Sequence, residues 1–172
     1  MTEVRPDGTR YDGRLYRPGV GAMLIDGRGW VLVGRRLDTR EEAWQMPQGG
    51  IDPGEEPRAA VLRELEEEIG TADAEIVAES SRWWSYDLPA PLAGRMWKGR
   101  FRGQRMKWFL LAFSGREADI RPDRVLHPEF QAWKWVPLDA LPTMIVPFKR
   151  PLYEEVVAEF GPLVKARVGM GL

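Results

Sequence analysis

Blocks of apolar residues, separated by polar and glycine-rich stretches, predict several strands in this chain. The apolar runs at 20–25 and 30–33 have strand length and flank a short turn-like segment, so we expect a β-hairpin. Residues 44–46 are expected to form a short strand, followed by turns over 47–54. Further strands are expected at 74–81, 107–113 and 130–136.

The segment 57–69 has the clearest helical pattern. Pro57 suits the first turn of a helix, and Gly70 suits the position just after its end. Apolar residues share one face of this helix, and another face carries acids. These acids are Glu64, Glu67 and Glu68. Because like charges on one helix face repel, we expect a cation there, and carboxylate oxygens suit Mg²⁺ or Mn²⁺. A solvated acidic face is the alternative interpretation.

A second helix is expected at 150–160, ended by Gly161 and Pro162. Strands mixed with two helices indicate an α/β fold in layers. The expected organisation is a flexible N-terminal tail at 1–15, one domain at 16–163 and a C-terminal tail at 164–172.

Composition excludes several classes of site. The chain has 172 residues and a formal net charge of -1, so overall charge does not favour binding to nucleic acid, and DNA is not expected as a partner. It has no Cys, which excludes thiolate ligands, and His127 alone cannot build a histidine-rich metal site. Without a secretory signal or a long apolar run, we expect a cytoplasmic protein with no membrane partner. The sequence does not determine the oligomeric state, and a monomer is assumed.

One run of residues carries a specific motif. Gly49, Glu55 and the segment 63–70 resemble the Nudix box, G-x5-E-x7-R-E-U-x-E-E-x-G-U, with every fixed residue at its spacing. The departure is Thr71, which stands at the closing apolar position. The resemblance implies a Nudix fold, an α/β/α sandwich with a mixed β-sheet and a loop-helix-loop that binds Mg²⁺, with Mn²⁺ as the alternative.

The same resemblance assigns roles to residues of the box. The implied metal ligands are Glu64, Glu67, Glu68 and a backbone carbonyl near Gly49. Arg63 is similar to the family's orienting arginine, whose guanidinium fork would hold Glu55 or Glu67. The implied reaction is attack of a metal-activated water on phosphorus.

A second resemblance spans residues 16–153 and points to the branch of RNA pyrophosphohydrolases and dinucleoside polyphosphate hydrolases. It rests on the segments 16–21, 44–50, 104–109, 128–130 and 148–150. In this branch Glu129 would serve the metals or activate water. The implied polyphosphate contacts are Arg17, Tyr86, Gln104 and Lys107. The implied contacts to the base are Arg36, Val146, Phe148 and Lys149.

The sequence leaves the substrate open between related hypotheses. The leading hypothesis is removal of pyrophosphate from 5′-triphosphorylated RNA, which promotes RNA decay. Hydrolysis of dinucleoside polyphosphates is the alternative, because the loop at 38–43 is similar to those enzymes. A catalytically idle nucleotide sensor and a hydrolase of non-standard nucleoside triphosphates are further alternatives.

Two other features have competing interpretations. The stretch 95–107 carries six basic residues and no acid, so it either steers a polyphosphate towards the acidic helix or is a plain solvated loop. The tryptophans at 83–84 and 133–135 are expected to pack in the core.

Overall fold

The structure is a computed structural model that describes residues 15–38 and 42–171. The strands are β1 (Leu15–Ile25), β2 (Val31–Arg36), β3 (Trp44–Gln45), β4 (Gln48–Gly50), β5 (Ala74–Glu79), β6 (Trp84–Asp87), β7 (Phe101–Phe113) and β8 (Phe130–Val136). The α-helices are α1 (Pro57–Ile69), α2 (Ala90–Ala93), α3 (Leu141–Met144) and α4 (Arg150–Gly169). Short 3₁₀ helices include η1 (Met96–Gly99) and η5 (Pro147–Lys149). Residues 1–14 of the expected tail and residues 39–41 of the loop at 38–43 lie outside the described residues, and Leu15 already belongs to β1.

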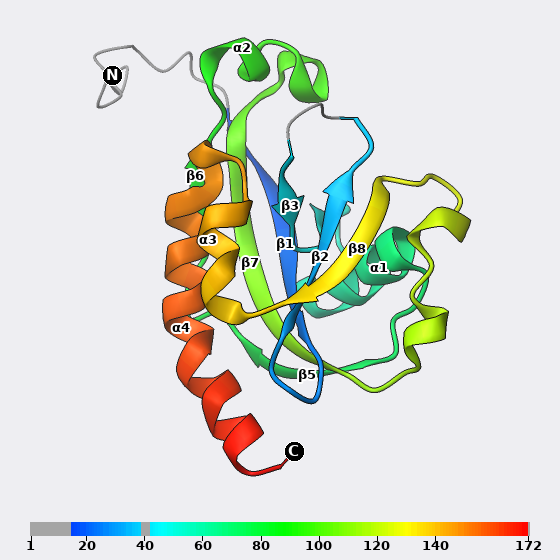
Figure 1. Cartoon of the computed structure of the whole chain (residues 1–172). Helices are drawn as coiled ribbons and strands as arrows, with labels where there is room; N and C mark the ends of the chain where they lie inside the picture. Colours follow the sequence, from blue (N-terminus) through cyan, green and yellow to red (C-terminus); the bar gives the residue numbers. More distant parts are fainter. Residues whose placement is uncertain (1–14, 39–41, 172) are drawn as a thin grey trace.

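The strands form one mixed sheet with helices on both faces (Figure 1), as the resemblance predicted. The central order is β3-β2-β1-β7-β5, with β1 and β7 parallel and the other pairs antiparallel. One core cluster lies between the sheet and α1 and includes Val61 and Leu65. The other lies against α4 and includes Tyr153 and Phe160. The fold is therefore an α/β/α sandwich.

The predicted hairpin is confirmed, and its strands separate soon after the turn. Asp26 accepts hydrogen bonds from the backbone of Arg28 and Trp30, which closes the turn. Beyond Ile25 and Val31, β1 pairs with β4 instead of β2, while β2 pairs with β3 and β8. The sheet thus opens between β1 and β2, which Figure 1 shows as β2 and β8 leaning away from β1. The segment from β3 to β4 lines both sides of this opening.

The prediction of turns throughout 47–54 was wrong at its start. Gln48, Gly49 and Gly50 pair with Gly21, Val20 and Gly19 of β1. Glycines on both strands leave room for the backbones and for side chains that approach from other elements. The pairing is long-range, so the local composition did not reveal it.

Helix α1 is confirmed from its first residue to its last. Pro57 begins it, and Gly70 ends it in the left-handed region at φ 90, where its backbone N–H bonds to the Glu66 carbonyl. The apolar face packs on the sheet through buried Val61 and Leu65. The helix axis and rotation are thereby fixed, which sets where its acids lie.

The strand expected at 107–113 begins earlier, at Phe101. Its first half pairs in parallel with β1, from Leu15 opposite Phe101 to Val20 opposite Lys107. The second half of the basic stretch 95–107, which was expected to be a loop, is therefore part of strand β7, because it pairs with β1. Strand β6 was missed and pairs with β7 here.

The C-terminal helix was predicted to end at residue 160, which was wrong. Helix α4 continues through Pro162 to Gly169, so residues 164–169 are not a tail. Val164 is 3% exposed and packs in the core on this side of the sheet. This burial stabilises the helix beyond the proline, which alone would favour its end. Within the described residues, no helix is long and apolar enough to cross a membrane.

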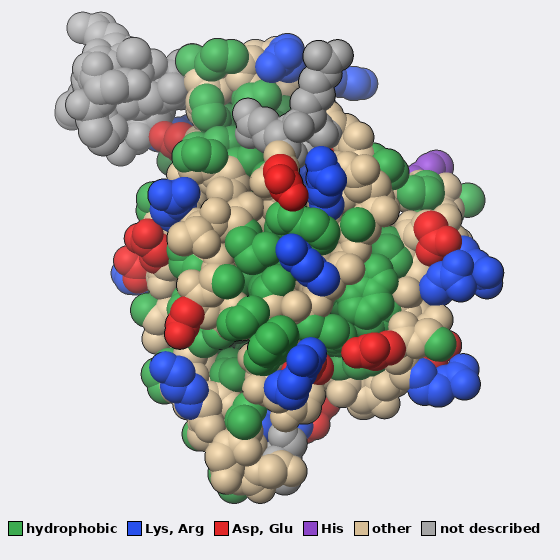
Figure 2. All heavy atoms as spheres, viewed as in Figure 1, with side chains coloured by type: hydrophobic (Ala, Val, Ile, Leu, Met, Phe, Trp, Pro, Cys, Tyr) green, Lys and Arg blue, Asp and Glu red, His purple; other side chains and the backbone are tan. Residues whose placement is uncertain are grey.

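The tryptophan prediction is confirmed at Trp84, Trp133 and Trp135, which are half-buried and pack against the two cores. It was wrong at Trp83, which is half-buried beside Arg105 and joins neither core. Figure 2 shows hydrophobic side chains across the middle of the face that carries α3 and α4, with both basic and acidic side chains scattered among them.

Candidate active site

Arg63 organises the acidic side of the site. Its guanidinium donates two hydrogen bonds to Glu55, at 2.7 and 2.8 Å, and one to the Gly50 carbonyl at 2.9 Å. Its Nη1 lies 3.0 Å from Glu64 and 3.2 Å from Glu67. The bond to Arg63 lowers the pKa of Glu55 to about 2. One planar fork therefore joins the loop before α1 to two acids of the helix.

Glu64 lies against the backbone of β4. A Cβ atom added to Gly49 would overlap the Glu64 carboxyl group, so the two residues are in close contact. The pKa of Glu64 is raised to about 7, first by burial and then by the charges of Glu67 and Glu129, against the lowering effect of Arg63. Gly49 is therefore needed for the position of this carboxylate.

Substitution of Gly49 by Ala is expected to displace Glu64 and to lower kcat/KM by roughly 100-fold, since small misplacements of reacting groups have effects of this size. Steady-state kinetics with the polyphosphate substrate at several Mg²⁺ concentrations measure the effect. Gly27→Ala is the matched control, because a Cβ at Gly27 meets nothing within 4 Å. Equal activity of both variants would show that Glu64 needs no such close approach.

Glu68 is the buried acid of the cluster. It is 2% exposed, and its Oε1 accepts a hydrogen bond of 3.1 Å from the backbone N–H of Gln48. Its Oε2 is buried and has no hydrogen-bond partner among the described residues. Burial, and next the charge of Glu129, raise its pKa well above the ordinary value. The helical wheel placed Glu68 with the other acids but did not show that it is buried.

Glu129 and Glu67 complete the cluster at its rim. Both are exposed, and the backbone carbonyl of Glu129 accepts a hydrogen bond of 2.9 Å from Leu37 after β2. The pKa of Glu129 is raised, first by desolvation, and the charges of Asp38 and Glu67 add to this. The acids from α1 and from the start of β8 therefore lie close enough to repel one another.

The cluster fits a divalent cation by the chemistry of its donors. Among residues 15–38 and 42–171, no group of Asp, Glu or His side chains already surrounds an ion site. Arg63 holds Glu64 and Glu67 in this arrangement. The unpartnered buried oxygen of Glu68 and the raised pKa values of Glu64 and Glu68 both indicate a place where positive charge is favourable. Oxygen donors of this kind suit Mg²⁺ or Mn²⁺.

A row of polar side chains crosses β1, β7 and β6 beside the cluster. Arg17 is paired with Gln104, and Gln104 with Tyr86. Tyr86 donates a hydrogen bond of 2.5 Å to Gln104 Oε1, and both side chains are buried. The charge of Arg17 lowers the pKa of both Tyr86 and Glu129, so this row lies near the acids. The structure thus brings three of the expected polyphosphate contacts together.

Lys107 lies apart from that row. It is three residues beyond Gln104 on β7, so alternation places it on the opposite face of the sheet. There it shares a row with Val20 and Gly49, on the face covered by α1. Lys107 would therefore approach a ligand from the side of the acids.

Two of the expected base contacts, Phe148 and Lys149, lie against Tyr86 of the polar row. Phe148 lies 6.0 Å from the ring of Tyr86, and Lys149 Nζ lies 5.3 Å from the same ring. Burial lowers the pKa of Lys149 to about 8, while Glu68 raises it. Arg36 pairs with Asp38 at 2.5 Å. Val146 packs against the core beside them.

Some residues of the site were not singled out from the sequence. Gln48 bonds to Glu68, and Tyr153 accepts a hydrogen bond of 2.9 Å from the backbone of Met46 in the segment between β3 and β4. Trp97 lies over Arg17. Gln48 belongs to a segment that carried the resemblance, which was a usable signal. Trp97 belongs to the basic stretch 95–107, but its contact with Arg17 had no signal in the sequence, and neither did the contact of Tyr153 with Met46.

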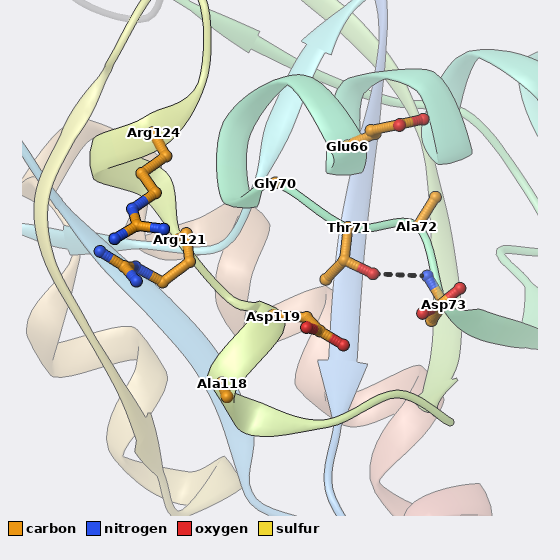
Figure 3. Close-up of a pocket in the computed structure, with 9 residues that line it drawn as sticks. All are labelled: Glu66, Gly70, Thr71, Ala72, Asp73, Ala118, Asp119, Arg121 and Arg124. Atoms are coloured by element: carbon orange, nitrogen blue, oxygen red, sulfur yellow. Dashed lines mark hydrogen bonds between the residues drawn. The ribbon is translucent and has the colours of Figure 1, made fainter.

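A separate polar pocket of about 580 Å³ lies at the C-terminal end of α1 (Figure 3). Glu66, Thr71 and Arg121 are among the residues that line it. Thr71 is 7% exposed, and its hydroxyl accepts a hydrogen bond of 3.1 Å from the backbone of Asp73. The one departure from the Nudix box is therefore satisfied locally, away from the acidic cluster.

Comparisons with known proteins agree with this geometry. Residues 15–156 match the family described as the NUDIX domain. The chain is 60% identical to an RNA pyrophosphohydrolase of Rhodospirillum rubrum over 86% of the chain and 88% of that protein. It is 51% identical to an RNA pyrophosphohydrolase of Rickettsia bellii over 87% of the chain and 92% of that protein.

Solved structures share the fold at low identity. The E. coli dihydroneopterin triphosphate pyrophosphohydrolase has a TM-score of 0.64 at 20% identity, covering 85% of this chain and 99% of its own. A C. elegans Ap4A hydrolase has a TM-score of 0.60 at 20% identity, covering 85% of this chain and 98% of its own. From the matched domain and the acids gathered around β4, the chain belongs to the Nudix hydrolase family.

Proposed function

We propose that the chain is a Mg²⁺-dependent RNA pyrophosphohydrolase that converts 5′-triphosphorylated RNA to 5′-monophosphorylated RNA. The oxygen of a water molecule attacks a phosphorus atom, the anhydride bond between the α- and β-phosphates breaks, and pyrophosphate is released. The electron pair of the broken bond stays on the leaving oxygen, and the water gives up a proton to the solvent. The relatives named RNA pyrophosphohydrolase, 47–60% identical over most of the chain, support this substrate class.

The observation that carries the proposal is the position of Glu68 between an acidic and a basic group. On one side the charges of Glu129 and Glu64 raise the pKa of Glu68. On the other side the charge of Glu68 raises the pKa of Lys149, and the charge of Arg36 lowers the pKa of Glu68. A substrate with a polyphosphate end and a base next to it needs these two environments in contact.

The chain's residues would divide the work as follows. Arg17, Gln104 and Tyr86 bind the phosphate oxygens through charged and neutral donors. Phe148 and Lys149 hold the neighbouring base. Glu64, Glu67, Glu68, Glu129 and the Gly49 carbonyl would hold Mg²⁺, which would supply an activated water and neutralise charge on the phosphates. Arg63 keeps the acids preorganised.

A direct comparison of substrates tests the proposal. The purified protein with Mg²⁺ is expected to hydrolyse a short 5′-triphosphorylated RNA with a higher kcat/KM than diadenosine tetraphosphate in the same buffer. The reverse order would establish dinucleoside polyphosphate hydrolysis as the main activity. Best efficiency on a free mononucleotide would contradict both. Absence of turnover on all three would indicate a nucleotide sensor.

Mg²⁺ is expected to stabilise the fold more at higher pH. The pKa of Glu64 is raised from 4.5 to about 7, so between these values the folded chain binds more protons than the unfolded chain. The free energy of unfolding without metal therefore falls as the pH rises through this window. Mg²⁺ binds the ionised carboxylates and offsets that loss. Melting temperatures with Mg²⁺ and with EDTA, at about pH 5 and about pH 8, measure the difference. If the increase in melting temperature caused by Mg²⁺ became smaller at the higher pH, the assignment of Glu64 as a metal ligand would be contradicted.

A further inference from the structure

The half-buried Arg17 is held in place by an aromatic ring instead of an acidic side chain. Its Cζ lies 5.1 Å from the centroid of the Trp97 ring. Among the described residues, none forms a hydrogen bond or an ion pair with its guanidinium. On its other side the group contacts Gly50, where a Cβ atom would overlap it. Arg17 is therefore confined between an aromatic ring and a glycine, with its N–H donors free.

The contrast with the neighbouring arginines is informative. Arg36 uses two donors on Asp38, at 2.7 and 2.5 Å. Arg63 uses its donors on Glu55, Glu64 and the Gly50 carbonyl. An ion pair fixes a guanidinium but occupies the N–H groups that a phosphate needs. An aromatic face attracts the cation through its quadrupole and leaves those N–H groups available.

The backbone that carries Trp97 has a strained conformation. Trp97 and Lys98 are the non-glycine residues with positive φ, at 50 and 58, among the residues that the structure describes. This region is uncommon for residues with a Cβ atom, and such strain persists where the surroundings enforce it. Trp97 also packs edge-on against Phe101, with ring centroids 6.1 Å apart. Ala93, in the same segment, is fully buried and anchors it to the core.

We propose that Trp97 is a positioning residue that fixes the Arg17 guanidinium at the polyphosphate end of the site while leaving its donors free for phosphate oxygens. The inference rests on the proposed function and concerns the binding of its substrate. Trp97 acts through Arg17 and need not touch the reacting atoms. Its loss should therefore weaken substrate binding more than it slows the chemical step.

Kinetics of substituted proteins on a short 5′-triphosphorylated RNA with Mg²⁺ test this inference. Trp97→Ala is expected to raise KM by about 5- to 30-fold, the range that cation–π contacts support, with little change in kcat. Trp97→Phe, which keeps an aromatic face, is expected to recover most of the affinity. Trp97→Leu, which keeps apolar bulk alone, is not. Trp30→Ala is the matched control, because Arg28 lies 4.1 Å over the Trp30 ring on the far hairpin.

A double-mutant cycle with Arg17→Ala separates positioning from other roles. Trp97→Ala is expected to have no further effect on KM when Arg17 is already absent. An unchanged KM in Trp97→Ala, an equal effect in both backgrounds, or a wild-type KM in Trp97→Leu would overturn the inference. Turnover of this RNA by the wild type and by Trp30→Ala tests the proposed function separately. If Trp97→Ala does not fold, as judged by circular dichroism, the Phe and Leu variants carry the comparison.

Discussion

Replacement of Glu68 by Gln is expected to lower kcat on 5′-triphosphorylated RNA by at least about 1,000-fold, because it removes a metal-binding charge at the centre of the site. The amide oxygen keeps the acceptor for the Gln48 N–H and has nearly the same shape. The buried carboxylate has no partner for Oε2 and a raised pKa, so a neutral group there should not destabilise the protein without metal. Glu68→Gln should therefore lose activity without losing stability.

The measurements for this variant are kcat and the melting temperature in EDTA. Glu66→Gln is the matched control, since Glu66 is exposed on the same helix and lines the separate pocket of Figure 3. The control should retain wild-type turnover. Retained turnover in Glu68→Gln would contradict the assigned role. A large fall in its melting temperature would instead assign Glu68 a structural function.

Replacement of Arg63 by Lys is expected to lower kcat/KM by about 100-fold and the free energy of unfolding by about 1–3 kcal/mol. Lysine keeps the charge but cannot hold both oxygens of Glu55 and also reach the Gly50 carbonyl. Glu64 and Glu67 would then lose their fixed positions. The pKa of Glu55, lowered to about 2 by this pairing, should rise towards its ordinary value.

Chemical denaturation, steady-state kinetics and NMR titration of Glu55 measure these effects. Arg58→Lys is the control, because Arg58 is exposed in the first turn of α1. Near-normal kinetics in Arg63→Lys would show that charge alone is sufficient. The acids would then not depend on the planar fork for their arrangement.

Local signals predicted the helix of the site well. Pro57 and Gly70 determine both ends of α1 through their own backbone preferences, and the spacing of its acids follows from helix geometry. Arg63 and its partners lie within one loop and one helix, so the motif contained their contacts. These parts of the site depend on neighbours in the sequence.

Other parts depend on contacts between distant segments and were missed. Strand β4 exists because β1 pairs with it, and glycine-rich sequence gives no periodic signal for a strand. Helix α4 passes Pro162 because Val164 is buried in the core. Glu68 is buried and accepts a hydrogen bond from Gln48 of β4, a contact between distant segments that no helical wheel shows. The contact of Arg17 with Trp97 likewise needs the folded chain.

Binding of Mn²⁺, followed by electron paramagnetic resonance, tests the central claim most directly. The wild type is expected to bind Mn²⁺ at the glutamates of α1, more tightly when an uncleavable polyphosphate analogue is present, and Glu68→Gln is expected to bind it at least about 10-fold more weakly. Equal Mn²⁺ affinity in the wild type and Glu68→Gln, with the analogue present, would contradict the account.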